Sequence, residues 1–154
     1  RRQPAAVITF DADGLYWHPD HIGVHERVLA AAQALGPSAP PVYGVTIRHG
    51  VMTAITDLAS AGGWAAPGDG FWSLPSDAFG KYAPDHTLVM DVKDWVPRKL
   101  SALASHESQM GASNPFSRLT EEDARRWLGS EFFRRVDKGP HQPALLERLC
   151  TQDC

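Results

Sequence analysis

Hydrophobic residues change their spacing along the chain, and these changes predict a βαβ unit. The apolar run 5–10 is short and rich in β-branched and aromatic residues, which predicts a buried strand. Over 19–35 apolar residues recur at helical spacing, and the pair Gly36-Pro37 ends the pattern. A second strand is predicted over 41–47. Strand, helix and strand in this order indicate a right-handed crossover in a largely parallel sheet.

The rest of the chain continues this alternation of strands and helices. The expected elements are a helix over 51–61, a strand over 86–92, a helix over 95–109, a helix that Thr120 caps and Gly129 ends, an edge strand over 131–136 and a closing helix over 142–149. No repeat or domain boundary is visible. We therefore expect an α/β protein with a three-layer, Rossmann-like, mainly parallel sheet flanked by helices.

One long segment, 63–85, interrupts the pattern with glycines and prolines among five aromatic residues. A loop of this length in a compact domain is usually functional or disordered, and the aromatic content argues against disorder. Two interpretations stay open. The aromatics form a hydrophobic lid or wall for a large substrate, or the loop packs its own aromatics on the surface.

Polar side chains gather where the first strand gives way to the helix, over 13–21. Pro19 suits the first helical position, and its ring biases His18 toward extended geometry just outside the helix. Asp20 and His21 then lie at the helix mouth. Imidazole binds zinc or transfers protons near neutral pH, and a neighbouring carboxylate can orient it. The alternative is a polar turn whose histidines cap the helix.

Two further residues near this turn are candidates. Asp11 could face a pocket, although an aspartate just before a glycine turn commonly serves the turn itself. His25 lies one helical turn beyond His21 and could share a metal with it. We favour a packed or supporting role for His25.

Composition narrows the classes of partner. The net charge of −3 gives no electrostatic case for nucleic acid. No apolar run approaches the roughly 20 residues of a membrane span, so none is expected. Cys150 and Cys154 lie in a polar tail, and two ligands do not make a zinc site. Free thiols there fit a cytoplasmic setting.

Two stretches resemble a known family. The run from Asp13 to Ile22, DGLYWHPDHI, looks like the second signature of the LmbE-like, or PIG-L, zinc deacetylases, roughly D-x-x-G-x-Y-G-H-P-D-H. This family includes N-acetylglucosaminyl-phosphatidylinositol deacetylases and mycothiol-pathway deacetylases. The run from Arg98 to Gln109 is similar to the family's K-x-x-A-L-x-A-H-x-S-Q helix. The order, spacing and flanking strands also fit, so the resemblance covers most of the chain.

The sequence departs from the family pattern in two respects. The family's first signature, A-H-P-D-D-E, is absent; in relatives it supplies a His and an Asp to zinc and another Asp as general base. We therefore expect residues 1–154 to be the C-terminal portion of one deacetylase domain. Its expected partner is the N-terminal segment of the same enzyme, as a nicked fragment or a separate chain. The second departure is Trp17, where relatives usually carry Gly.

The resemblance implies that Zn²⁺ is the cofactor and an amino-sugar acetamide the substrate. His21 would be a zinc ligand, and His18 would stabilise the oxyanion as an imidazolium and protonate the leaving amine. Asp20 would orient an imidazole, most simply that of His18. Tyr16 would hydrogen-bond the tetrahedral intermediate or the substrate carbonyl. The remaining substrate-binding candidates are Trp17, Asp11 and His106, the last of which continues the apolar stripe of the predicted 95–109 helix.

Three functions follow as hypotheses. The first is a deacetylase acting on an N-acetylglucosaminyl group of a glycosylated natural product, such as a glycopeptide-antibiotic pseudoaglycone, because Trp17 and the aromatic loop suggest a large apolar substrate. The second is a deacetylase of a small thiol- or lipid-linked N-acetylglucosamine. The third is a non-catalytic sugar-binding or interaction module that has lost the first metal motif.

Overall fold

The computed structural model describes residues 4–110, 114–136 and 145–150, which fall into two compact units. The first unit consists of the described residues within 1–48, 82–90 and 131–154, and the second of those within 49–81 and 91–130. We describe each unit by itself, and the single-domain organisation stays a prediction. Within the described ranges, no helix is long and apolar enough to cross a membrane.

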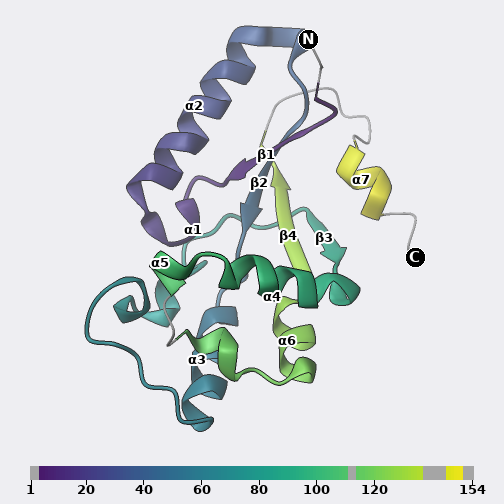
Figure 1. The fold of residues 1–154 in the computed structure, drawn as a ribbon. Coiled ribbons are helices and arrows are strands. Elements are labelled where there is room, and N and C mark those ends of the chain that lie inside the picture. The colour runs from purple at the N-terminus through teal and green to yellow at the C-terminus, as the bar shows by residue number, and fades with distance from the viewer. Residues whose placement is uncertain (1–3, 111–113, 137–144, 151–154) are drawn as a thin grey trace. The chain divides into compact units, whose positions relative to one another are not determined.

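A four-stranded sheet in the order β1-β2-β4-β3 is central to the first unit (Figure 1). The strands are β1 (Val7–Phe10), β2 (Val42–Thr46), β3 (Leu88–Asp91) and β4 (Ser130–Arg135). β1 runs parallel to β2, with Val7 opposite Val42, whereas β4 runs antiparallel to β2, with Tyr43 opposite Arg135. The sheet is therefore mixed rather than mainly parallel as predicted, because β4 pairs antiparallel with β2, while the predicted α/β class with its Rossmann-like arrangement is confirmed.

The prediction that the last strand lies at an edge is wrong, because β4 lies between β2 and β3. Arg134 and Arg135 place two charges in this strand, a composition typical of an edge strand. In the structure Arg134 pairs with Asp11 and Arg135 lies 3.6 Å from Glu147, so both charges have acidic partners near the sheet. A strand with paired charges can occupy an interior position.

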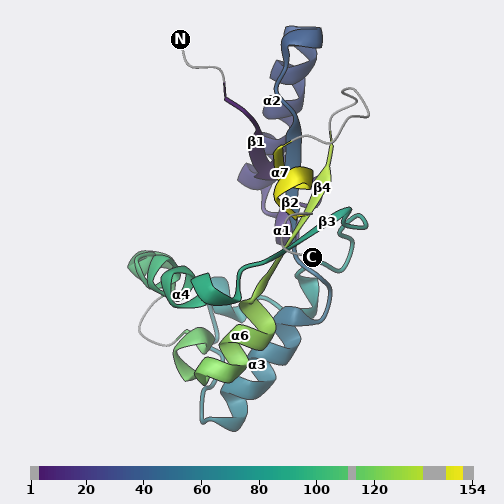
Figure 2. The ribbon, with the colours of Figure 1, turned by 90° about the vertical axis from the view of Figure 1, so that its right-hand side faces the viewer.

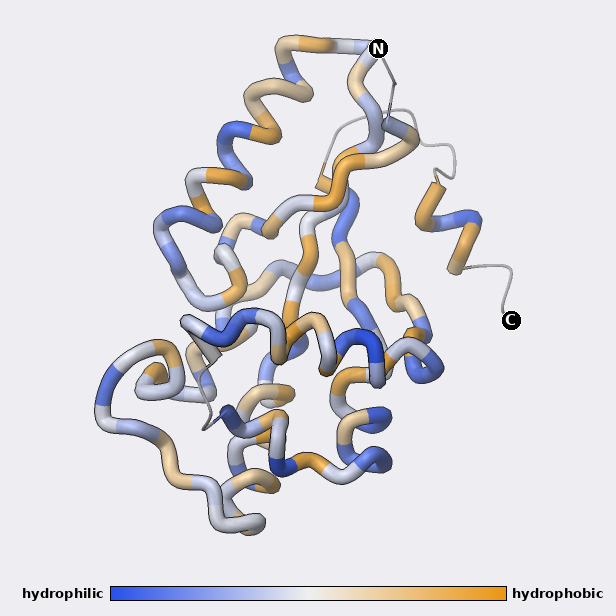
Figure 3. The backbone as a smooth tube through the Cα atoms, in the orientation of Figure 1, coloured by the Kyte–Doolittle hydropathy of each residue, from blue (hydrophilic) through white to orange (hydrophobic). Residues whose placement is uncertain are grey.

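The helix α2 (Pro19–Leu35) connects β1 to β2 and has the predicted bounds. A short helical turn, α1 (Gly14–Trp17), precedes it. The start of α2 follows from Pro19 in its first turn. Gly36 ends α2 with a φ of 54°, a conformation that favours glycine. The tube in Figure 3 alternates between hydrophilic and hydrophobic along α2, as expected for a helix with one covered face.

The core of the first unit is a cluster formed by Tyr43, Phe133 and Leu146, which are 0%, 4% and 7% exposed. Leu146 belongs to α7 (Leu145–Cys150), so the predicted closing helix is present there, while positions 142–144 lie outside the described residues. The Tyr43 hydroxyl donates a hydrogen bond to the Glu147 carboxylate. Burial, together with this carboxylate, raises the pKa of the Tyr43 hydroxyl. An apolar and a polar contact thus fix α7 on the sheet.

The second unit is mainly helical. Its helices are α3 (Val51–Ala61), α4 (Val96–Ala104), α5 (Glu107–Met110) and α6 (Glu121–Leu128), and its 3₁₀ turns are Phe71–Ser73, Ser76–Ala78, Lys93–Trp95 and Pro115–Arg118. α3 and α6 lie side by side (Figure 2). The Thr120 cap is confirmed, because its hydroxyl accepts a hydrogen bond from the backbone N–H of Asp123.

The predicted helix over 95–109 is wrong in its length, because it breaks between α4 and α5. The Ser105 hydroxyl donates to the Ser101 carbonyl, and the backbone N–H of His106 bonds the Leu103 carbonyl three residues back. These local bonds compete with continued α-helix. His106 is exposed at this break rather than on a helical stripe.

Segment 63–85 packs most of its aromatic side chains inward. Trp64, Trp72 and Phe79 are 6%, 8% and 5% exposed, and Phe71 contacts both Trp72 and Phe79 edge to face. This arrangement favours the loop that packs its own aromatics. Tyr82, which is 65% exposed, differs and belongs to the first unit.

The two leucines of α7 give a matched test of this packing. Leu146→Ala should lower the free energy of unfolding by about 2–5 kcal/mol, because it removes a buried side chain from the cluster. Leu149→Ala, at a position that is 45% exposed, should change it little. Urea denaturation measures both values. Equal effects from the two substitutions would show that α7 does not dock through Leu146.

Candidate active site

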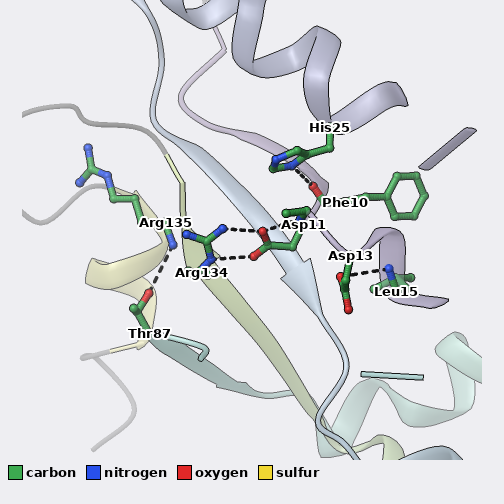
Figure 4. Close-up of polar contacts among 9 residues, drawn as sticks. Phe10, Asp11, Asp13, Leu15, His25, Thr87, Arg134 and Arg135 are labelled. Carbon is green, nitrogen blue, oxygen red and sulfur yellow. Dashed lines mark hydrogen bonds and ion pairs between the residues drawn. The ribbon is translucent and has the colours of Figure 1, made fainter. Parts of the chain in front are cut away.

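A buried ion pair anchors the carboxyl end of β1. Asp11 is 0% exposed; Arg134 on β4 donates to it from Nε at 2.9 Å and from Nη2 at 2.6 Å (Figure 4). The backbone N–H of Ala12 donates to the same carboxylate at 2.7 Å. Hydrogen bonding to Asp11 raises the pKa of the Arg134 guanidinium. Gly44 on β2 makes room for the pair, since a Cβ there would lie 2.7 Å from Asp11 Cγ.

The backbone that follows is strained. φ is 54° at Gly14, 68° at Leu15 and 64° at Trp17, and Leu15 and Trp17 are the non-glycine residues with positive φ in the described ranges. This left-handed conformation costs roughly 1–2 kcal/mol at a residue with a side chain. Such strain clusters at functional sites. The glycine that the family pattern carries at position 17 would adopt this φ without that cost.

Asp13 holds the strained turn together. Its carboxylate accepts a hydrogen bond from the backbone N–H of Leu15 at 3.1 Å, and the residue is 3% exposed. Burial raises the pKa of the Asp13 carboxyl above its ordinary value of 3.8, and the negative charge of Asp11 raises it further. The ionised carboxylate is therefore costly at this position.

The histidines that follow differ in tautomer, as their hydrogen bonds indicate. His21 Nδ1 lies 3.1 Å from the carbonyl oxygen of Gly14, and His25 Nδ1 lies 2.8 Å from that of Phe10. In neutral rings both Nδ1 atoms must carry the proton, which leaves the lone pair on Nε2. His18 is the reverse: its Nδ1 accepts from the backbone N–H of Asp20 at 3.2 Å, so a neutral ring carries its proton on Nε2.

The two signature histidines and Tyr16 lie together, in line with the family pattern. The rings of His18 and His21 are 4.8 Å apart, and Tyr16 meets them edge to face at 5.7 Å and 5.4 Å. Phe10 stacks on His21 with ring centroids 3.8 Å apart and 3° between the planes. Burial raises the pKa of the Tyr16 hydroxyl, so near neutral pH it is a neutral hydrogen-bond donor.

Two predicted site residues make contacts other than those expected. The backbone N–H of Asp20 bonds His18, while its carboxylate is exposed, so its orienting role stays a prediction. Asp11 is fully buried and its two oxygens bind Arg134, which assigns it a structural contact. Its substrate-binding role also stays a prediction.

The other two predicted substrate-binding residues are both exposed. Trp17 lies in the first unit and contacts Tyr82, and His106 lies in the second unit at the break between α4 and α5. Their roles stay predictions.

The sequence analysis missed Asp13, Arg134 and Gly44. Asp13 carried a usable signal, since an aspartate before glycine at a strand end is a typical turn cap. Arg134 carried no local signal, because its partner Asp11 is 123 positions away. Gly44 lies inside a strand, where a glycine marks close approach of another group.

The described residues fit one ligand of a metal site. Nδ1–H of His21 is bound to a backbone carbonyl, which is how metal-binding histidines are commonly oriented, and this leaves Nε2 as the atom that could bind a metal. No group of three or more His, Cys, Asp or Glu in the described part of the chain could hold a metal ion by itself. A zinc site takes three or four protein ligands, so His21 fits as one member of a larger set.

Comparison with curated proteins finds relatives of a single class. Its homologues are N-acetylglucosaminyl deacetylases of the LmbE-like, or PIG-L, family, which confirms the predicted resemblance. No protein-family model matches the chain.

The individual relatives carry the name 1D-myo-inositol 2-acetamido-2-deoxy-alpha-D-glucopyranoside deacetylase. The protein from Gordonia bronchialis is 34% identical over 160 aligned residues, which cover 95% of this chain and 54% of the relative. Those from Thermomonospora curvata and Kribbella flavida are each 29% identical, over 94% and 92% of this chain and 52% and 50% of their own lengths. The chain spans about half the length of the curated relatives it matches.

A pair of glycines tests the packing around Asp11. Gly44→Ala should destabilise the protein by about 1–3 kcal/mol, because the new methyl group overlaps the buried carboxylate. Gly23→Ala is the matched control: nothing lies within 4 Å of its added Cβ, and the position is helical. It should stabilise by about 0.5–1 kcal/mol. Urea denaturation gives both signs, and a neutral Gly44→Ala would contradict the close approach.

Asp13 predicts a dependence of stability on pH. Its raised pKa means that the folded protein binds this proton more tightly than the unfolded chain. The contribution of protonated Asp13 to the free energy of unfolding is therefore complete below pH 3.8, and it is lost as pH rises through the folded-state pKa of Asp13. Asp13→Asn keeps an acceptor for Leu15 without the charge, so it should be more stable than the parent at pH 7, with the difference shrinking on acidification.

Thermal unfolding at several pH values measures this difference. Asp91→Asn is the opposing control, because hydrogen bonds from Lys93 lower the pKa of Asp91 and its substitution should not stabilise the protein at pH 7. A difference for Asp13→Asn that stays constant with pH would overturn the assignment.

Proposed function

We propose that this chain carries one half of a zinc-dependent deacetylase active site, which hydrolyses the acetamide of an N-acetylglucosaminyl compound. One observation carries the proposal. At the carboxyl end of β1, His21 and His18 lie side by side with opposite tautomers, one suited to bind a metal and the other to donate a hydrogen bond. The names of the homologues give the reaction class.

In this proposal His21 holds the metal through Nε2, and its ring is fixed by the Gly14 carbonyl and the stacked Phe10. Bound Zn²⁺ would lower the pKa of a coordinated water toward neutrality. The sequence 1–154 does not contain A-H-P-D-D-E. The remaining ligands and the general base are therefore proposed to come from another segment of the enzyme. That segment is the proposed partner.

His18 is proposed to act on the oxyanion. With Nδ1 engaged by the backbone of Asp20, the neutral ring offers its Nε2–H as a hydrogen-bond donor to the oxyanion. Protonation of the leaving amine needs the imidazolium form, because a neutral imidazole that lost its Nε2 proton would become an anion. His18 is also the N-cap of the 17-residue helix α2, whose N-terminus favours developing negative charge. The imidazolium expected from the resemblance would have to give up this cap. Tyr16 supplies a second neutral donor.

The substrate stays within the class of N-acetylglucosaminyl compounds. The relatives are named for an inositol-linked sugar, so a small thiol-pathway precursor is one candidate. The exposed Trp17 supports a larger acceptor, such as a glycopeptide-antibiotic pseudoaglycone. A cytoplasmic location is also part of the proposal.

A second candidate function is a sugar-binding module without catalysis. The exposed aromatic pair of Trp17 and Tyr82 favours it, because aromatic faces bind carbohydrate by stacking. This function predicts sugar binding without zinc and without acetate release. Acetate measured after incubation with an N-acetylglucosaminyl compound separates the two.

Histidine substitutions in the complete enzyme test the proposed roles. His21→Ala should abolish bound zinc, measured by plasma mass spectrometry. His18→Ala should keep zinc and lower the acetate-release rate by about 10²–10³-fold, as expected for loss of one positioned hydrogen-bond donor to the oxyanion. His49→Ala, an exposed histidine of the second unit, is the control and should change neither value. Normal zinc content in His21→Ala, or normal turnover in His18→Ala, would refute the corresponding role.

A further inference from the structure

Two aromatic side chains lie exposed and in contact on the first unit. Trp17 is 53% exposed and Tyr82 is 65% exposed, although they come from segments far apart in the sequence. Their ring centroids are 6.0 Å apart, with 69° between the planes. The two rings therefore form an open, nearly right-angled corner, which we call the aromatic corner.

The aromatic corner is fixed to the active-site turn. The backbone N–H of Trp17 bonds the Asp13 carbonyl at 2.8 Å, and the next residue, His18, caps α2. The left-handed φ of 64° at Trp17 sets the direction in which the indole leaves this turn. The indole thus starts one residue from the proposed oxyanion donor.

Trp17 stabilises the fold poorly for so large a side chain. It combines a strained backbone with an exposed apolar ring, and either one alone favours a smaller or more polar residue. Contact with a ligand would offset both costs. Tyr82 adds a second exposed aromatic at the same place.

We propose that the aromatic corner is the subsite for an aromatic aglycone attached to the N-acetylglucosaminyl group, an inference that rests on the proposed function. A third ring can stack on the indole face while its rim meets Tyr82, and aromatic pairs favour such offset and edge-to-face contacts at centroid separations of 4.5–7 Å. A polyol acceptor such as inositol needs several hydrogen-bond partners, and this corner offers one indole N–H and one phenol hydroxyl.

Product binding tests the subsite apart from catalysis. The probes are 4-nitrophenyl and methyl α-glucosaminide, which share the sugar and have no acetamide left to hydrolyse. Calorimetry on the complete enzyme should show about tenfold tighter binding of the nitrophenyl compound, as expected from two aromatic contacts. Trp17→Gly suits the local φ and should reduce this preference to below about threefold, and Tyr82→Ala should reduce it in part.

Two further variants sharpen the test. Trp17→Phe keeps a ring and should retain most of the preference. Trp95→Ala removes a tryptophan that is 57% exposed in the second unit and should leave the preference unchanged. Equal affinity of the parent for the two probes, or the same loss from Trp95→Ala, would overturn the subsite.

Acetate release from the acetylated forms of the two probes reports on the proposed function separately. A Trp17-dependent aryl preference without acetate release would support the aromatic corner while the hydrolytic function fails. Acetate release from both compounds without any binding preference would support the hydrolytic function and overturn the aromatic corner.

Discussion

The candidate site depends on the buried ion pair between Asp11 and Arg134. A fully buried carboxylate is stable only when paired, and here a bidentate guanidinium from β4 satisfies it across the face of β2. Gly44 supplies the space. The pair links the end of β1 to β4, with β2 between them, at the point where the chain leaves β1.

After Asp11 the chain turns sharply, and this turn positions the two histidines of the candidate site. Left-handed backbone at Gly14, Leu15 and Trp17 brings the Gly14 carbonyl onto His21 and leaves His18 at the mouth of α2. The hydrogen bonds of the two rings are therefore made with backbone groups, while Phe10 stacks on His21. Such support fixes which nitrogen of each ring carries the proton. A site built in this way needs few other residues of its own chain.

Local signals predicted much of this arrangement, and distant pairings could not be predicted. α2 has the predicted bounds because Pro19 and Gly36 determine its ends through their own backbone preferences. The sequence pattern of DGLYWHPDH also predicted that His18 and His21 lie close together. β4 was misplaced because Arg134 looks solvated until Asp11 is beside it. The left-handed φ at Trp17 could not be predicted from the residue type, because tryptophan rarely adopts this conformation whereas glycine does so readily.

The role proposed for His21 is to bind the catalytic metal through Nε2. Its most direct test is an anomalous difference map, recorded at the zinc absorption edge from crystals of the complete enzyme grown with zinc. The account predicts a peak about 2.0–2.1 Å from His21 Nε2, the usual zinc–imidazole distance. A map with zinc bound elsewhere, or with no peak beside His21, would contradict it.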